Sequence, residues 1–183
     1  MKLLSVRAEG GKDMRSVHVA SVAYENAKGN RKIVPVFSRR EIRKSADLAG
    51  YVSGVQAIVT DKDDRILVVK EFRLAVNRWV YGFPAGMPDK GEDYVCAACR
   101  EVFEETGIRC MAETVMPPAY INPAESNEQL VTVYCKTDNA DTIRPSDCAN
   151  EEIEAKFYSQ DELRALMKDT DNVFSLSLMT TLL

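Results

Sequence analysis

Residues 86–108 constrain this chain more than any other stretch, and their sequence is GMPDKGEDYVCAACREVFEETGI. A loop opened by Gly86 runs directly into a segment with helical spacing of apolar side chains, residues 93–106. Gly107 is placed to end that helix, because glycine adopts the left-handed conformation common at helix C-termini. The sequence therefore predicts a loop followed by an amphipathic helix.

Three carboxylates of this helix, Glu101, Glu104 and Glu105, project within one narrow fan beside the apolar face. Like charges at this spacing cost roughly 0.2–0.5 kcal/mol per pair unless something neutralises them. Arg100 is placed to neutralise Glu104 at i+4, which leaves Glu101 and Glu105 as a hard-oxygen pair suited to Mg²⁺ or Mn²⁺. A solvated acidic face is the alternative for any isolated group of this kind.

The whole pattern decides between these alternatives. It matches Gly-x5-Glu-x7-Arg-Glu-apolar-x-Glu-Glu-x-Gly-apolar at every fixed position, namely Gly86, Glu92, Arg100, Glu101, Val102, Glu104, Glu105, Gly107 and Ile108. The chain therefore resembles the Nudix hydrolases. The resemblance implies an α/β/α sandwich with a mixed sheet and hydrolysis of a nucleoside diphosphate linked to another group. It also implies the Ala85 carbonyl as a further metal ligand beside Glu101 and Glu105, and Glu151 as a third acidic contributor to the metal cluster.

Features outside the box narrow the resemblance to the ADP-ribose pyrophosphatase-like branch. Residues 72–73 and 79–86 are similar to the segment that leads into the box there, and Pro123 stands where that branch carries a proline. In that branch an N-terminal strand unit builds a dimer and part of the substrate pocket, which implies a homodimer. Gly82 and Ala149 depart from the pattern, since the branch usually has a glutamate at the first position and some members an acidic residue at the second.

Four residues are candidates for substrate binding. Gly86 lets the backbone approach closely, and Arg73 is suited to bind a phosphate bidentately, although a surface ion pair explains it equally well. Trp79 and Phe83 are candidates for stacking on a base or sugar, with a place in the core as the alternative.

The general base is open among three glutamates. Glu104 is close to the expected metal site, but its pairing with Arg100 competes with that role. In the pyrophosphatase branch a glutamate of the late loop often takes part, which favours Glu151 first and Glu152 second. A solvated loop is the alternative for both.

Periodicity and turn residues predict an α/β chain with a mixed sheet. A small antiparallel unit within residues 1–45, with strands at 16–24 and 32–37, precedes a Nudix domain over 46–183. Pro35 restricts its strand to an edge or a bulge. Further strands are expected at 51–60, 65–72, 114–120, 129–135 and 153–158, a hairpin turn at 61–64, and helices at 160–168 and 173–182, the first of them capped by Ser159.

Length and composition exclude several classes of protein. The 183 residues suit one domain with a modest extension, and 45% hydrophobic residues suffice for a core. The absence of a signal peptide and of long apolar runs predicts a cytoplasmic protein without a membrane span. No nucleic-acid-binding module is present. The odd number of cysteines, five, predicts reduced thiols, and Cys96-x-x-Cys99 lacks the second pair that a zinc site needs.

The expected substrate is a nucleoside diphosphate-linked small molecule, with ADP-ribose or a related nucleotide sugar favoured. GDP-mannose, dinucleotides and oxidised nucleotides are alternatives within the same chemistry. A non-catalytic sensor that only binds ADP-ribose is an alternative of another class, and it would be expected to show a damaged box.

Overall fold

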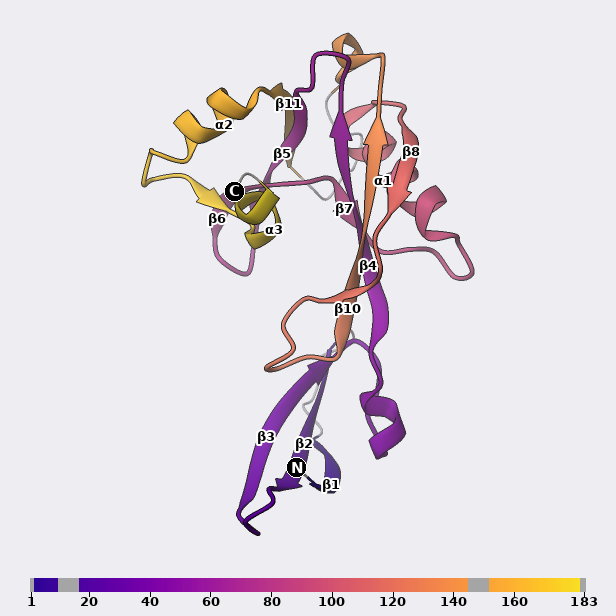
Figure 1. Ribbon diagram of the computed structural model, residues 1–183, viewed down its shortest axis with the longest axis vertical. Helices are drawn as coiled ribbons and strands as arrows, with labels where there is room; N and C mark the ends of the chain where they lie inside the picture. Colours follow the sequence, from indigo (N-terminus) through magenta and orange to yellow (C-terminus); the bar gives the residue numbers. More distant parts are fainter. Residues whose placement is uncertain (1, 10–16, 145–151, 182–183) are drawn as a thin grey trace. The chain divides into compact units, whose positions relative to one another are not determined.

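The computed structural model describes residues 2–9, 17–144 and 152–181 (Figure 1). The chain divides into two compact units. Unit 1 comprises residues 1–53 and 118–130, and unit 2 comprises residues 54–117 and 131–183. The predicted Glu151 and Ala149 lie outside the described residues.

Unit 1 contains a three-stranded antiparallel sheet in the order β1-β2-β3. Its strands are β1 (Lys2–Glu9), β2 (His18–Glu25) and β3 (Arg31–Ser38), and a short 3-10 helix, η1 (Ser45–Leu48), follows. The two predicted strands and their turn are confirmed, whereas β1 was missed. Pro35 lies in β3, an outer strand of this sheet, as its missing N–H requires.

The turn between β2 and β3 is held by its first residue. Asn26 Oδ1 accepts hydrogen bonds from the backbone N–H groups of Lys28 and Asn30, at 2.9 and 3.0 Å. Gly29 takes a φ of 79°, which glycine adopts without steric cost. Unit 1 also contains β9 (Ala119–Tyr120), which pairs with the start of β10.

A mixed sheet runs through unit 2 in the order β12-β6-β5-β4-β10-β8, with β11 paired to β5 and β7 to β4. Hydrogen bonds from Gln56 to Thr132 and from Thr137 to Thr60 join β4 and β10 at a nearly constant sequence offset, so these two strands are parallel (Figure 1). The other strand bounds are β4 (Tyr51–Thr60), β5 (Ile66–Arg73), β6 (Arg78–Gly82), β7 (Ala85–Gly86), β8 (Met111–Val115), β10 (Glu128–Lys136), β11 (Ile153–Tyr158) and β12 (Val173–Phe174).

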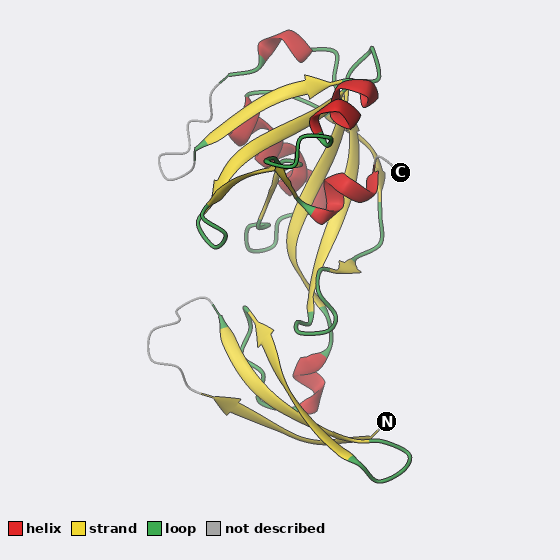
Figure 2. Ribbon diagram, turned by 90° about the vertical axis from the view of Figure 1, so that its left-hand side faces the viewer, coloured by secondary structure: helices red, strands yellow, loops and turns green. Residues whose placement is uncertain are grey.

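Both faces of this sheet are covered. Residues 55–59 of β4 and 66–69 of β5 are buried without alternation, a pattern typical of strands packed on two sides. One side holds a core cluster that includes Leu163 of α2 (Gln160–Leu166) and Leu178 of α3 (Leu176–Thr181). Helix α1 (Tyr94–Thr106) covers the other side (Figure 1), and Figure 2 shows helices in front of and behind the sheet, so the predicted α/β/α sandwich is confirmed.

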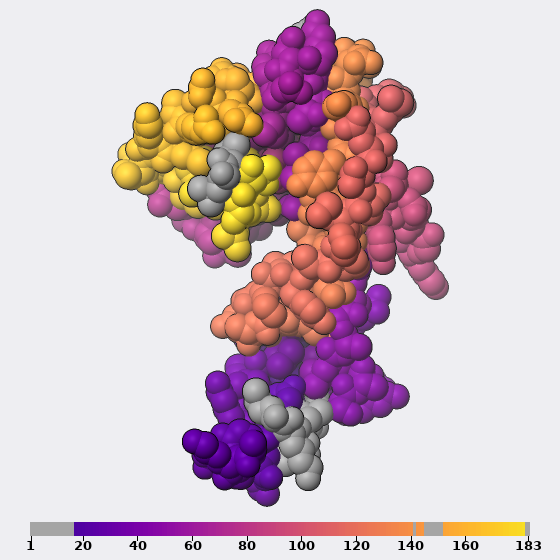
Figure 3. Space-filling view, viewed as in Figure 1, coloured from indigo at the N-terminus to yellow at the C-terminus, as the bar shows by residue number. Residues whose placement is uncertain are grey.

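The C-terminal segment differs partly from the prediction. The strand over 153–158 and the Ser159 cap are confirmed, because Ser159 and Glu162 form a reciprocal capping box. The helix predicted over 173–182 is wrong at its start, since β12 pairs in parallel with β6 and Phe174 stacks on Tyr81 at 5.4 Å. Helices α2 and α3 and strand β12 gather on one side of unit 2 (Figure 3).

Two further differences concern strands. The predicted strand over 114–120 is two shorter strands, β8 and β9, separated by a segment that contains two prolines, Pro117 and Pro118. Strands β6 and β7 were not predicted as strands. A 3-10 turn, η2 (Ala140–Thr142), lies in the late polar stretch. Among the described residues, no helix is long and apolar enough to cross a membrane.

Candidate active site

The helix that carries the box glutamates is fixed at both ends by its own sequence. The Asp93 side chain accepts hydrogen bonds from the N–H groups of Val95 and Cys96, at 2.9 and 3.3 Å, which caps the helix start. At the other end Gly107 adopts a φ of 73° and its N–H donates to the Phe103 carbonyl. The predicted helix and its terminating glycine are therefore confirmed.

Strand β7 brings the backbone against the carboxylates of α1. A Cβ added to Gly86 would overlap the Glu101 carboxylate, so only glycine leaves room for that side chain. The Ala85 N–H donates to Glu105 Oε1 at 3.3 Å, and Glu105 is only 5% exposed. Four residues that the sequence predicts for the site are thus brought together, namely Ala85, Gly86, Glu101 and Glu105.

Arg100 organises the surrounding carboxylates. Its Nε and Nη2 donate to the two oxygens of Glu92, both at 3.0 Å, in a bidentate pair. Its Nη1 donates to Glu101 at 2.9 Å and to Glu104 at 3.0 Å. Nη2 also donates to the Met87 carbonyl at 3.1 Å, which ties the loop to the helix. The predicted pairing with Glu104 is confirmed, and the contacts with Glu92 and Glu101 were missed.

Glu92 holds the loop rather than facing β7. One of its oxygens also accepts from the Asp89 N–H at 2.9 Å. The bond from Arg100, followed by that from Asp89, lowers the pKa of Glu92 below its ordinary value. In return, Glu92 and then the charges of Glu101 and Glu104 raise the pKa of Arg100, against the effect of burial. Glu92 and Arg100 are therefore both charged at neutral pH.

Carboxylates outnumber guanidinium groups among the described residues of this cluster. One guanidinium faces the carboxylates of Glu92, Glu101 and Glu104, and the buried Glu105 lies beside them on α1. When several carboxylates lie close together, each disfavours the ionised form of the others, and a nearby cation favours that form. The donors of Glu101 and Glu105 are hard oxygens, and Gly86 leaves room for the Glu101 carboxylate, so these residues fit Mg²⁺ or Mn²⁺.

The three predicted substrate residues outside the box have different environments. Arg73 forms an ion pair with Glu71 at 2.7 Å and is about half exposed. Trp79 lines a pocket of about 340 Å³ with Lys70, whose ammonium lies 5.5 Å from the ring centre. Phe83 is only 4% exposed and belongs to the core cluster, so its ring has no free face for stacking on a ligand. For Phe83 the structure supports the core alternative.

The structure describes two of the three candidate bases. Glu104 is bound to Arg100 and is about half exposed. Glu152 is exposed, and its backbone carbonyl accepts from the Phe72 N–H at 3.3 Å. Glu151 lies outside the described residues.

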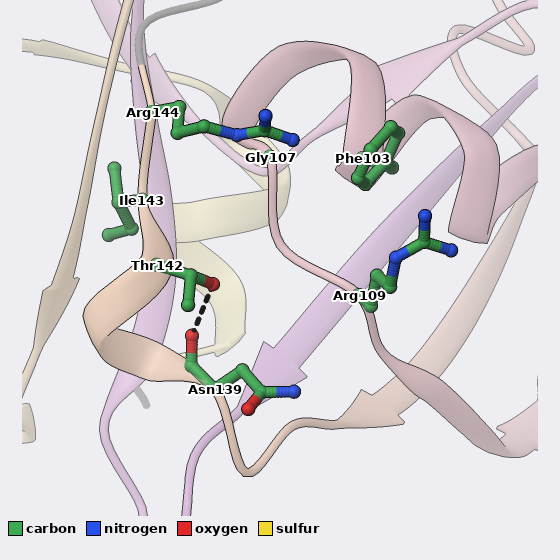
Figure 4. A pocket seen from close by; sticks show the side chains of 7 residues that line it. All are labelled: Phe103, Gly107, Arg109, Asn139, Thr142, Ile143 and Arg144. Carbon is green, nitrogen blue, oxygen red and sulfur yellow. Dashed lines mark hydrogen bonds between the residues drawn. The ribbon is translucent and has the colours of Figure 1, made fainter.

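A second pocket, of about 580 Å³, lies on another face of α1. In Figure 4 the guanidinium groups of Arg109 and Arg144 approach the ring of Phe103, at 4.7 and 5.4 Å from its centre. Phe103 stands roughly 200° around the helix from Glu101. This pocket is therefore separate from the box carboxylates.

Three cysteine side chains, one of them from α1, lie close together. This cluster was not predicted from the sequence. The sulfur atoms of Cys99, Cys110 and Cys135 lie within 4.8 Å of one another, whereas Cys96 is exposed. Burial raises the pKa of Cys99 to about 11. A hydrogen bond with Cys135, together with burial, raises the pKa of Cys110. The C-x-x-C spacing therefore does not indicate this cluster, because Cys96, its first cysteine, is not a member of it.

The sequence-family model of the NUDIX domain matches residues 50–178 of this chain. The chain belongs to the Nudix family. It is 34% identical over 104 residues to the ADP-sugar pyrophosphatase of Mus musculus, covering 56% of this chain and 47% of that protein. It is 35% identical over 102 residues to the ADP-ribose pyrophosphatase of Saccharomyces cerevisiae, covering 54% of this chain and 43% of that protein.

These similarities confirm the resemblance to the ADP-ribose pyrophosphatase-like branch of the Nudix family. The chain spans less than half the length of either relative. Among solved structures, that of an ADP compounds hydrolase superposes with a TM-score of 0.65 at 19% identity, covering 93% of this chain and 84% of that one. This likeness supports the Nudix fold.

Proposed function

We propose that this chain hydrolyses the pyrophosphate bond of a nucleoside diphosphate linked to another group, with ADP-ribose or a related nucleotide sugar as substrate and Mg²⁺ as cofactor. The observation that carries the proposal is the packing of Glu101 and Glu105 against β7, with hard-oxygen donors side by side. The names of the relatives, ADP-sugar and ADP-ribose pyrophosphatase, support the substrate class.

Glu101 and Glu105 would hold the ion, with the Ala85 carbonyl as a further ligand. When bound, Mg²⁺ supplies positive charge against the pyrophosphate oxygens and activates a water for attack. Mn²⁺ fits the same oxygen donors. The chain's own contribution is the support of this site by Arg100. Its guanidinium donates one hydrogen bond to Glu101 and another to the Met87 carbonyl of the loop, which holds the two together.

In the reaction the water oxygen bonds to one phosphorus, the bond from that phosphorus to the bridging oxygen breaks, and a nucleoside monophosphate and a sugar phosphate leave. A base takes the proton of the water. We assign this role to Glu151, with Glu152 and Glu104 as alternatives. The assignment predicts that Glu151→Gln lowers kcat by about 10²–10⁴ with little change in KM. Glu152→Gln should lower kcat less severely, and a Glu151→Gln enzyme with more than about a tenth of wild-type kcat would transfer the role to Glu104 or Glu152.

The proposed activity is tested with a panel of ADP-ribose, ADP-sugars, GDP-mannose, a dinucleotide and an oxidised nucleotide, each with Mg²⁺ and with EDTA. Glu105→Gln removes one carboxylate ligand, and glutamine has nearly the same shape as glutamate. We therefore expect turnover to fall by orders of magnitude while the melting temperature stays the same. Full turnover in EDTA, or a wild-type rate for Glu105→Gln, would contradict the metal assignment.

The same panel separates the second function class. A sensor would bind ADP-ribose in a calorimeter without turning it over at any Mg²⁺ concentration. The complete set of box glutamates favours the enzyme.

We also propose that unit 1 mediates a homodimer. Its strand β3 exposes Ile33, which is 69% accessible, and Phe37, which is 40% accessible. Apolar side chains exposed on a small sheet are suited to pack on a second copy. A monomer by light scattering at micromolar concentration would argue against the dimer.

A further inference from the structure

The cluster of Cys99, Cys110 and Cys135, called here the thiol cluster, is not used by the proposed hydrolysis. Its members come from three elements of unit 2: the middle of α1, the segment just before β8, and β10. Their sulfur atoms all lie within 4.8 Å of one another, and those of Cys99 and Cys110 are 3.8 Å apart. Two thiolates bound to one tetrahedral Zn²⁺ at about 2.3 Å lie about 3.8 Å apart. The cluster therefore already has nearly the spacing of a metal site.

The surrounding structure holds these sulfur atoms in place. The Thr137 hydroxyl donates to the Arg109 carbonyl at 2.8 Å, which fixes the backbone next to Cys110 against the end of β10. The pairing of β8 with β10 shifts in register between Tyr134 and Cys135. Such irregularities re-aim a side chain and occur often beside functional sites.

We propose that the thiol cluster binds one thiophilic divalent ion, Zn²⁺, through three cysteine sulfurs and one exogenous ligand. Soft thiolates select Zn²⁺ over Mg²⁺, so this site does not compete with the hard oxygens of Glu101 and Glu105. Cys135 is 2% exposed, whereas Cys99 and Cys110 are partly exposed, which leaves an entry path and room for the fourth ligand. The ion would join α1 to β10.

A disulfide is the competing use of neighbouring thiols. It would require two sulfurs at about 2.0 Å and would leave the third cysteine out. A bound ion uses all three, which is why the arrangement favours the metal.

The test uses the full chain with Cys96→Ser and Cys148→Ser, in which every remaining cysteine belongs to the thiol cluster. Cd²⁺ is added to the reduced, metal-free protein, because its charge-transfer absorption arises from thiolates and not from carboxylates. We expect the absorption to saturate at one equivalent and to be displaced by Zn²⁺. A hundredfold excess of Zn²⁺ over its Kd should raise the melting temperature by about 5–10 °C.

Adding Cys110→Ser or, separately, Cys99→Ser to this background should remove the absorption and the thermal shift. Circular dichroism of each metal-free variant establishes that it is folded. The proposal is overturned if the background protein gives no absorption, if both serine variants keep it, or if mass mapping of protein purified without reductant finds a Cys99–Cys110 disulfide that Zn²⁺ does not prevent. None of these readouts depends on hydrolysis, so the proposed activity can fail without affecting them.

Discussion

Two clusters of arginine and carboxylates in unit 2 use the same chemistry for different ends. The box cluster consists of Glu92, Arg100, Glu101 and Glu104, and the hairpin cluster consists of Asp61, Asp63 and Arg65 in the turn between β4 and β5. Both are built from charge-assisted hydrogen bonds between a guanidinium and carboxylates. They differ in how many carboxylates share one guanidinium, which is two in the hairpin cluster and three in the box cluster.

In the hairpin cluster the buried carboxylate of Asp61 is fully engaged. One oxygen accepts from the N–H groups of Asp63 and Arg65, at 3.0 and 2.9 Å, and the other accepts from the Arg65 guanidinium, at 2.8 Å from Nε. Asp61 is only 2% exposed. A buried charge satisfied in this way fixes the turn, so the cluster serves the fold.

In the box cluster one guanidinium is shared among three carboxylates, and Glu105 adds a fourth nearby. Glu101 and Glu105 of this group lie next to β7. The comparison teaches that the number of carboxylates sharing one guanidinium, rather than the presence of ion pairs, separates a cluster that stabilises a turn from one suited to bind a cation.

Among the variants that test this comparison, the largest expected effect comes from changing the shape of the box site. In Gly86→Ala the new Cβ would overlap the Glu101 carboxylate, which must then move. A misplacement of about 1 Å in a catalytic site can cost about 10²-fold in rate, and we expect kcat/KM to fall by about that factor. Steady-state kinetics at several Mg²⁺ concentrations measure the loss.

Gly91→Ala is the matched control in the same loop. Gly91 has a φ of 82° but no neighbour within 4 Å of an added Cβ. This variant should lose about 1–2 kcal/mol of stability through backbone strain and retain most of its activity. Equal losses of activity in both variants would mean that the loop, and not the position of Glu101, limits the rate.

A smaller effect is expected from Arg100→Lys. Lysine keeps the charge but cannot reproduce the bidentate pair with Glu92 together with the bonds to Glu101 and Glu104. We expect about a tenfold loss of kcat/KM, corresponding to about 1.4 kcal/mol, and a higher half-saturating Mg²⁺ concentration. Arg109→Lys, which alters an arginine over Phe103 outside the box cluster, should leave both quantities unchanged. An Arg100→Lys enzyme with wild-type kinetics would show that Glu101 is held by other contacts.

How far the sequence predicted these features depends on how local they are. The fan of Glu101, Glu104 and Glu105 and the bond from Arg100 to Glu104 follow from helical spacing alone, and both were predicted correctly. The bidentate pair of Arg100 with Glu92 was missed, because it depends on how the loop folds back over the helix.

Features that depend on distant partners could not be predicted from local patterns. Val173 and Phe174 form β12 only because β6 lies beside them, and the same pairing explains Gly82. A Cβ at Gly82 would come within 3.3 Å of the Ser175 hydroxyl oxygen, so a larger side chain would crowd the segment after β12. The thiol cluster was missed for the same reason, since Cys135 reaches Cys99 only through the sheet.

The third prediction concerns the hairpin cluster and should change stability without changing activity. Asp61→Asn removes the charge that pairs with Arg65 and turns one acceptor into a donor facing the guanidinium. The expected loss is about 1–3 kcal/mol in the free energy of unfolding at neutral pH, measured by urea denaturation, with kcat/KM unchanged. Asp63→Asn is the control, because Asp63 is exposed and its contact with Arg65 is 3.8 Å long, and we expect a change within about 0.5 kcal/mol.

The pH dependence of this loss distinguishes a charge effect from a change of shape. Burial alone would raise the pKa of Asp61, but the bonds from the Arg65 backbone and guanidinium and from the Asp63 backbone lower it below its ordinary value. A carboxylate with a lowered pKa in the folded state stabilises the protein fully above its unfolded pKa, about 3.9, and loses that contribution as the pH falls through its folded pKa. The stability difference between wild type and Asp61→Asn should therefore be constant near neutral pH and shrink below about pH 4. A difference that stays the same down to the acid transition would assign the effect to the shape of the turn and not to its charge.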